Sequence, residues 1–183
     1  LRKRGGSLAD IAILIVDINE GFKPQTIESI EILKINKVPF IVAANKVDLI
    51  PGWSNNPGKG LLGNIGSLSH QIQGDFEKKM YELVGKIQEF DFESERFDRV
   101  SDYTKQVAIV PISAKTGQGI PELLMVLTGL AQKFLEKKLE IEETGKCKGT
   151  VLEVKEEKGL GTTLDLIIYN GGLKVNDTLI IGG

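Results

Sequence analysis

Three runs of consecutive apolar residues mark the first two thirds of the chain, and each has the length and composition of a buried β-strand. A stretch with apolar residues at helical spacing follows the first run, and Pro24 suits the first turn of that helix. A strand–helix–strand unit of this kind places its two strands in parallel. Amphipathic helices are also predicted at residues 67–90 and from Pro121 onward. The three apolar runs cover residues 11–17, 38–42 and 107–112.

Two further segments connect the second predicted strand to the third. Residues 49–66 are rich in glycine, asparagine and proline, and we expect an irregular surface loop there. Residues 95–103 are predicted as a short helix with Ser94 as its N-cap and with Phe97 and Val100 facing inward. The long amphipathic helix lies between these two segments in the sequence.

Beyond residue 145 the hydrophobic period changes to two, which is typical of antiparallel strands with one exposed face. Residues 139–145 are charged and poor in apolar side chains, and we predict a linker there. The sequence therefore predicts an α/β domain over residues 1–138 and the beginning of an antiparallel β-barrel over residues 146–183. Strands of this second domain are predicted at residues 148–155 and 163–169, with another beginning at 178–181.

Composition narrows the class of protein. The chain has 183 residues, 41% hydrophobic and 26% charged, and a formal net charge of -2, so nothing demands a broad basic surface for nucleic acid. The single cysteine, Cys147, cannot form an internal disulfide, which favours a reducing compartment. No apolar run approaches the ~20 residues that a membrane span needs. We expect a cytoplasmic protein with no membrane partner.

Polar motifs follow the second and third predicted strands directly. In an open parallel sheet, ligands bind outside the carboxyl ends of the strands, so these motifs are candidates for one binding site. Either motif alone is a weak signal, but both at carboxyl strand ends, in this order, form a strong one. The first has the Asn-Lys-x-Asp spacing of the guanine-reading motif of GTP-binding proteins. The candidate site residues are Asn45, Lys46, Asp48, Ser113, Ala114 and Lys115.

These residue types suit the recognition of guanine. The Asp48 carboxylate can accept from two guanine nitrogens at once, an arrangement that adenine cannot offer. The aliphatic stem of Lys46 can cover a ring face. The backbone N–H of Ala114 can donate to the guanine oxygen, and Asn45 can tie the two loops together through its amide. A base without the matching donors would leave a carboxylate unpaired, which can cost on the order of 10⁴ in selectivity.

The sequence contains no motif for phosphate binding and no candidate catalytic residue. The stretch Gly52–Gly60 has glycines and Lys59, but its spacing is one residue too long for a phosphate loop, and Gly60 stands where Ser or Thr would ligate magnesium. The only histidine, His70, has no neighbouring cysteine or paired carboxylate and is interpreted as a surface residue. We therefore assign no catalytic residue and no metal ligand in this chain.

Beyond the two base motifs, several segments carry a resemblance to one family across nearly the whole chain. The sequence resembles the carboxyl-side half of the GTP-binding domain, and the start of the second domain, of the universal translation initiation GTPase. This family is called initiation factor two in bacteria and initiation factor five-B in archaea and eukaryotes, and the insertion with Trp53 resembles the latter branch. The matching segments include residues 1–6, 16–26, 116–124, 158–161 and 170–175.

The resemblance implies a partial sheet of the P-loop GTPase type, GTP or GDP as ligand, and action on the ribosome with initiator tRNA to promote subunit joining. It also implies that magnesium accompanies the nucleotide, with ligands outside this chain. The phosphate loop and the catalytic elements would lie in a missing amino-side half of the domain that precedes Leu1. The chain as given should then not hydrolyse GTP alone.

Two alternatives stay open at the level of sequence. The first is a non-catalytic, GTPase-like module that binds the ribosome or a protein. The second is another translational GTPase, such as an elongation or tRNA-selective factor.

Overall fold

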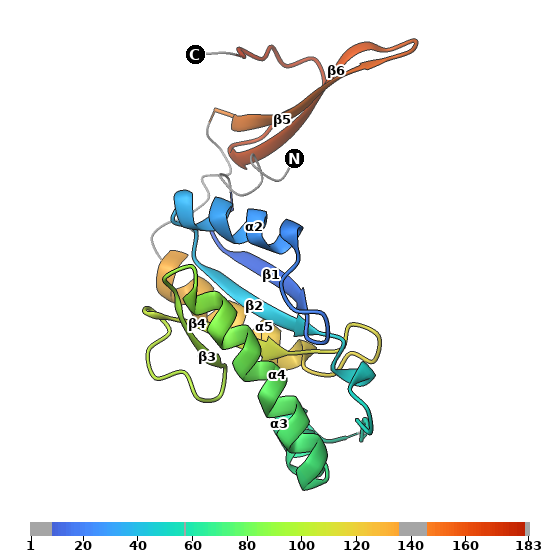
Figure 1. Cartoon of the computed structure of the whole chain (residues 1–183). Helices are drawn as coiled ribbons and strands as arrows, with labels where there is room; N and C mark the ends of the chain where they lie inside the picture. Colours follow the sequence, from blue (N-terminus) through green and yellow to red (C-terminus); the bar gives the residue numbers. More distant parts are fainter. Residues whose placement is uncertain (1–8, 57, 136–145, 182–183) are drawn as a thin grey trace.

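The computed structural model describes residues 9–56, 58–135 and 146–181 (Figure 1). The predicted linker 139–145 and the first residues 1–8 lie outside the described residues. In the described parts the chain forms a four-stranded sheet with helices and, further along, a two-stranded sheet. The elements are β1 (Ala12–Asp17), α2 (Pro24–Ile35), β2 (Phe40–Asn45), η1 (Val47–Leu49), α3 (Leu61–Gly66), α4 (His70–Gln88), β3 (Glu93–Arg96), β4 (Gln106–Pro111), α5 (Ile120–Leu135), β5 (Lys148–Glu157) and β6 (Gly161–Asn170).

The four-stranded sheet has the order β1-β2-β4-β3, and all its neighbouring strands run parallel. The first five residues of β2 are buried, as expected for a central strand with side chains packed on both faces. In Figure 1, α4 crosses in front of the sheet and α5 lies behind it. The predicted α/β class and parallel sheet are therefore confirmed, and the parallel strands direct all four carboxyl ends to one edge.

The predicted helix at residues 95–103 is wrong, because Glu93–Arg96 forms the edge strand β3. It pairs in parallel with β4, with Ser94 opposite Val107, so Ser94 is a strand residue and not a helix cap. Four polar residues in a row give no hydrophobic period, which is why the sequence pattern did not indicate a strand. Phe97 is nevertheless buried, as predicted.

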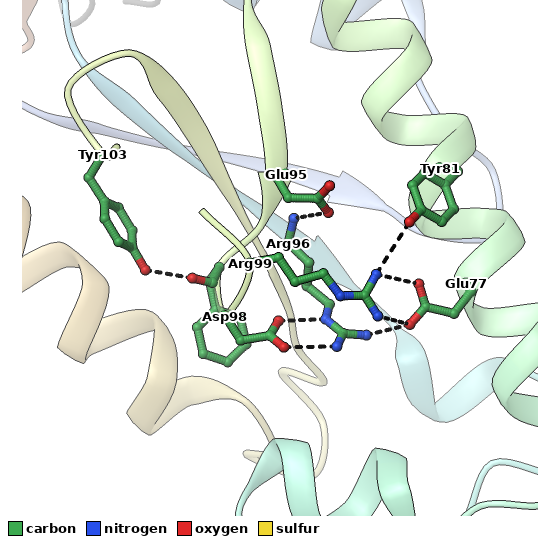
Figure 2. A network of polar contacts seen from close by, with 8 residues as sticks. Glu77, Tyr81, Glu95, Arg96, Asp98, Arg99 and Tyr103 are labelled. Carbon is green, nitrogen blue, oxygen red and sulfur yellow. Dashed lines mark hydrogen bonds and ion pairs between the residues drawn. The ribbon is translucent and has the colours of Figure 1, made fainter. Parts of the chain in front are cut away.

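A network of ion pairs explains how such a polar strand can lie against the core (Figure 2). The Arg96 side chain is only 8% exposed, and its guanidinium forms a two-pronged contact with Asp98, with 2.5 Å from Nε to Oδ1 and 2.8 Å from the second nitrogen to Oδ2. Its third nitrogen lies 2.6 Å from Glu77 of α4, and Glu77 also accepts from Arg99. A buried charge needs such partners, so the strand end is fixed to α4 by charge-assisted hydrogen bonds.

The glycine-rich stretch is not irregular throughout, because Leu61–Gly66 forms the short helix α3. A carboxylate distant in sequence supports its first turn: Oε1 of Glu122 in α5 accepts from the Leu61 N–H at 2.8 Å. The Asn64 side chain is fully buried and bonds the backbone of Ser54 and Asn56. These partners lie outside the helix, so local glycine content alone predicted the wrong structure.

The carboxyl-terminal part of the described chain contains a long hairpin, β5 and β6, which pair antiparallel. This confirms the change to period two. The strand predicted at residues 178–181 does not form: these residues have no regular structure and no partner strand in the described part of the chain. A barrel beyond the hairpin stays a prediction.

Candidate functional site

The two polar motifs leave the sheet side by side. Ala44 of β2 is paired with Pro111 of β4, the last residue of that strand. Two hydrogen bonds continue the pairing past the strands: Ile112 N–H to Ala44 O at 2.8 Å, and Val47 N–H to Ile112 O at 3.2 Å. The sheet thus brings the segments 45–48 and 113–115 to the same edge, as the sequence predicted.

Asn45 joins the two loops through one oxygen. Its Oδ1 accepts from the Lys46 N–H at 2.8 Å and from the Ala114 N–H at 3.0 Å. The tie that was predicted for the Asn45 amide is therefore present. The Ala114 N–H is already engaged in this bond, so a ligand oxygen that approached it would share the donor with Asn45 as a three-centre hydrogen bond.

The second tie connects Asp48 with Ser113. The fully buried Ser113 hydroxyl donates to Asp48 Oδ1 at 2.6 Å and accepts from the Thr116 N–H at 3.1 Å. Its single proton and one of its two lone pairs are thereby used, which fixes the rotation of the hydroxyl. In the described part of the chain, Asp48 Oδ2 has no hydrogen-bond partner, so the half-buried carboxylate keeps acceptor positions for a ligand's N–H groups.

Two residues of the β1 edge belong to this site, and the motifs alone did not reveal them. Asp17, the last residue of β1, lies with Oδ2 at 2.7 Å from Lys46 Nζ. Asn19 donates from Nδ2 to the Lys46 carbonyl at 3.0 Å, and its N–H donates to Asp17 Oδ1 at 2.8 Å. Since β1 is parallel to β2, Asp17 lies at the same edge of the sheet. The rule that ligands bind at the carboxyl ends of parallel strands could have identified it from the sequence.

These contacts stabilise an unusual backbone at Lys46. Its φ is +70°, in the left-handed region, which residues with a side chain rarely occupy without support. The Asn19 bond to its carbonyl and the Asn45 bond to its N–H hold the peptide groups on either side. The structure thus fixes both the direction of the Lys46 stem and the position of its ammonium group.

The charges of this pair support each other. Burial acts to raise the pKa of Asp17, but the hydrogen bond from Lys46, the Asn19 N–H and the Lys46 charge outweigh it, so the pKa lies below its ordinary value. The hydrogen bond to Asp17 and then its charge raise the pKa of Lys46. Both groups are therefore ionised near neutral pH.

The remaining candidates lie as follows. Lys115 is exposed at the loop that follows β4, and Ala114 beside it is exposed as well. His70 is exposed as the first residue of α4, in agreement with its interpretation as a surface residue. Within the described ranges, no group of three or more histidine, cysteine, aspartate or glutamate residues could hold a metal ion. The same ranges contain no helix that is long and apolar enough to cross a membrane.

Comparison with known proteins decides the family. The family model described as the elongation factor Tu GTP binding domain matches residues 1–133. This chain belongs to that family. Among curated members, the probable translation initiation factor IF-2 of Thermococcus onnurineus is 58% identical over the whole chain, which covers 31% of that relative. The corresponding factor of Methanocella arvoryzae is 55% identical with the same coverage.

A solved structure of this family shares the fold. The chain superimposes on aIF5B from Aeropyrum pernix, a structure described as GDP-bound, with a TM-score of 0.83 and 47% identity; 92% of this chain and 29% of that chain are covered. The resemblance to a translation initiation GTPase is confirmed, and so is the predicted fold class. The chain spans about a third of the length of the curated relatives that it matches.

Proposed function

We propose that this chain reads the guanine base in a translation initiation GTPase. The observation that carries the proposal is the pair of ties at one sheet edge, Asn45 to Ala114 and Asp48 to Ser113. Together they hold a carboxylate and a backbone donor in one place, on two loops that are supported by buried parallel strands. The GDP in the 47% identical neighbour supports the same class of ligand.

The contacts that we assign to these residues are with the guanine base, and none is with the phosphates. Asp48 would accept from the two adjacent N–H donors of guanine, Lys46 would cover the ring with its stem, and Ala114 would contact the carbonyl oxygen. Bound GTP supplies the phosphoryl group that is cleaved, and we propose that its phosphates and magnesium are held by parts of the protein outside residues 1–183. We assign residues 1–138 to the GTP-binding domain and residues 146–183 to the start of a β-barrel domain.

The activity of the whole protein follows from family membership as a proposal. We infer that the intact factor binds GTP and GDP, acts in the cytoplasm on the ribosome together with initiator tRNA, promotes subunit joining and hydrolyses GTP. Guanine selection by this chain would then determine which nucleotides the factor binds. The initiation factors named among the relatives support this role over that of a passive module.

Replacing Asp48 by Asn in the full-length factor tests the base assignment. The amide turns one acceptor into a donor, so we expect GDP affinity to fall by about 100-fold or more and affinity for xanthosine diphosphate to rise. Competition binding with labelled GDP measures both. Asp75→Asn makes the same chemical change at an exposed position of α4 and should leave both affinities unchanged. An unaltered preference for GDP in the Asp48 variant would contradict the assignment.

A further inference from the structure

The loop that carries Ser113 and Ala114 closes on Gln118. The Ser113 N–H donates to the Gln118 carbonyl at 2.9 Å, and the Gly117 N–H donates back to the Ser113 carbonyl at 2.8 Å. The next residue, Gly119, has φ of +78°, and a Cβ there would lie 2.1 Å from the carbonyl oxygen of Pro111. The position of Gln118 therefore sets the geometry of the base-reading loop directly.

The Gln118 side chain is buried and bonded to an aromatic residue from the other side of the site. Its Oε1 accepts from Trp53 Nε1 at 3.0 Å, and the residue is only 8% exposed. Trp53 follows the first motif closely, and its backbone N–H donates at 2.9 Å to the carbonyl of Ile50, the C-cap residue of η1. Trp53 thus connects the segment after Asp48 to the loop after β4, at a third point beyond the two ties already described.

The ring of Trp53 rests on a rigid support. Its centroid lies 5.4 Å from that of Phe76, which is fully buried in α4. The Arg96 guanidinium lies 5.9 Å from the centroid of the same Phe76 ring. Since Phe76 is enclosed by the core, the indole N–H has a fixed direction toward Gln118.

We propose that Trp53 is a positioning residue for guanine recognition, acting through Gln118 on the loop that holds Ser113 and Ala114. The proposal rests on the proposed function of the site. Residues that orient ligand-contacting groups contribute to affinity when the contacted geometry must be held within a few tenths of an ångström. The beginning of the glycine-rich insertion would then stabilise the geometry of the base site.

Two substitutions test the bond in the full-length factor. Trp53→Phe keeps an aromatic ring against Phe76 but removes the N–H donor, and Gln118→Met removes the acceptor with little change in volume. For each variant we expect GDP affinity to fall about three- to tenfold, in line with the loss of one hydrogen bond, and the ratio of GDP to IDP affinity to fall with it. IDP lacks the amino group that Asp48 would read, so the ratio reports the geometry of base recognition. The double variant should lose no more than either single variant, because both remove the same bond.

Tyr103→Phe is the matched control. It removes a hydrogen bond of similar burial, from the Tyr103 hydroxyl to the Phe97 carbonyl at 2.6 Å, on the connection that precedes the amino end of β4. We expect it to lower thermal stability without changing the GDP to IDP ratio. Equal ratios in the Trp53, Gln118 and Tyr103 variants and in the wild type would overturn the proposal.

A second measurement does not depend on nucleotide. Hydrogen exchange of peptides covering residues 113–118 should be faster in Trp53→Phe than in the wild type without any ligand, and unchanged in Tyr103→Phe. Unchanged exchange in Trp53→Phe would overturn the positioning role even if the factor prefers GDP. A wild-type factor that binds ADP as well as GDP would instead contradict the proposed function, and the positioning role in base recognition with it.

Discussion

Asp17 shows how one residue outside a recognised motif can fix the position of a side chain within that motif. Its side chain is 14% exposed, and its carboxylate receives the ammonium group of Lys46 and the N–H of Asn19. Lys46 has a left-handed backbone and a flexible stem, so without these partners its side chain would have many orientations. The ion pair restricts this freedom before any ligand binds, so less side-chain entropy is lost on binding.

Replacing Asp17 by Asn should therefore weaken guanine nucleotide binding without changing base preference. We expect GDP affinity in the full-length factor to fall about three- to tenfold, because the partner of Lys46 loses its charge. The ratio of GDP to xanthosine diphosphate affinity should stay at the wild-type value, because Asp48 is intact. Fluorescence titration with a labelled GDP measures the first quantity and competition the second.

Glu20→Gln is the control for that experiment. Glu20 forms an exposed ion pair with Lys23 in the same connection between β1 and α2, and exposed pairs contribute little. An Asp17 variant that behaves like the Glu20 variant would show that the Lys46 ion pair has no part in binding.

At the scale of elements, β3 and its ion pairs hold one side of the sheet. The strand has only four residues, and its last residue, Arg96, is buried. Ion pairs with Asp98 and Glu77 balance its charge. The hydrogen bond from Arg96 is the main cause that lowers the pKa of Asp98, against the opposing effect of burial. A pKa that is lower in the folded state means that the ionised carboxylate stabilises the fold.

Asp98→Asn should reduce the free energy of unfolding by about 1–3 kcal/mol at pH 7, because among the described residues Arg96 then keeps only Glu77 as a charged partner. The contribution of Asp98 is fully present above its ordinary pKa of 3.8 and is lost as the pH falls through the lower value of the folded state. The difference between wild type and variant should therefore shrink in acid. Urea unfolding at pH 7 and near pH 3 measures both.

Glu89→Gln provides the comparison, since it removes the exposed Lys86–Glu89 pair at the end of α4. Its effect should stay within about 0.5 kcal/mol at either pH. A difference for Asp98→Asn that is just as small at pH 7 would show that the network does not stabilise the fold.

The elements that sequence predicted and those it missed differ in one physical respect. The strands β1, β2 and β4 have apolar runs, and α4 has a full apolar face, so local pattern sufficed to predict them. β3 is stabilised by ion pairs to α4, and α3 by the Glu122 carboxylate, and both partners are distant in sequence. The same holds at the site: the two motifs have a recognisable spacing, whereas Trp53 and Gln118 became visible only in the fold.

At the scale of the whole molecule, the described chain has a free sheet edge. In the described part, β1 pairs with β2 and with no other strand, and its residues Ile13 and Ile15 are 39% and 64% exposed. An unpaired edge with apolar side chains favours association with further strands. The two initiation factors compared above are about three times as long as this chain. Under the function proposed above, an amino-side half of the GTP-binding domain would cover this edge.

If the phosphates are held outside this chain, the isolated chain of residues 1–183 should bind guanine ligands with the same affinity whether or not they carry phosphates. Phosphate contacts contribute much of nucleotide affinity, through helix N-termini and cations that we place outside this chain. We expect GDP to bind at least about 100-fold more weakly than to the full-length factor, and guanosine to bind the isolated chain as well as GDP does. Calorimetric titration of both ligands into both proteins measures the four affinities, after a cooperative thermal transition has shown that the isolated chain is folded. In the full-length factor GDP should bind far more tightly than guanosine. A strong preference of the isolated chain for GDP would show that residues 1–183 contain a phosphate site after all, and would overturn the division of the nucleotide site proposed above.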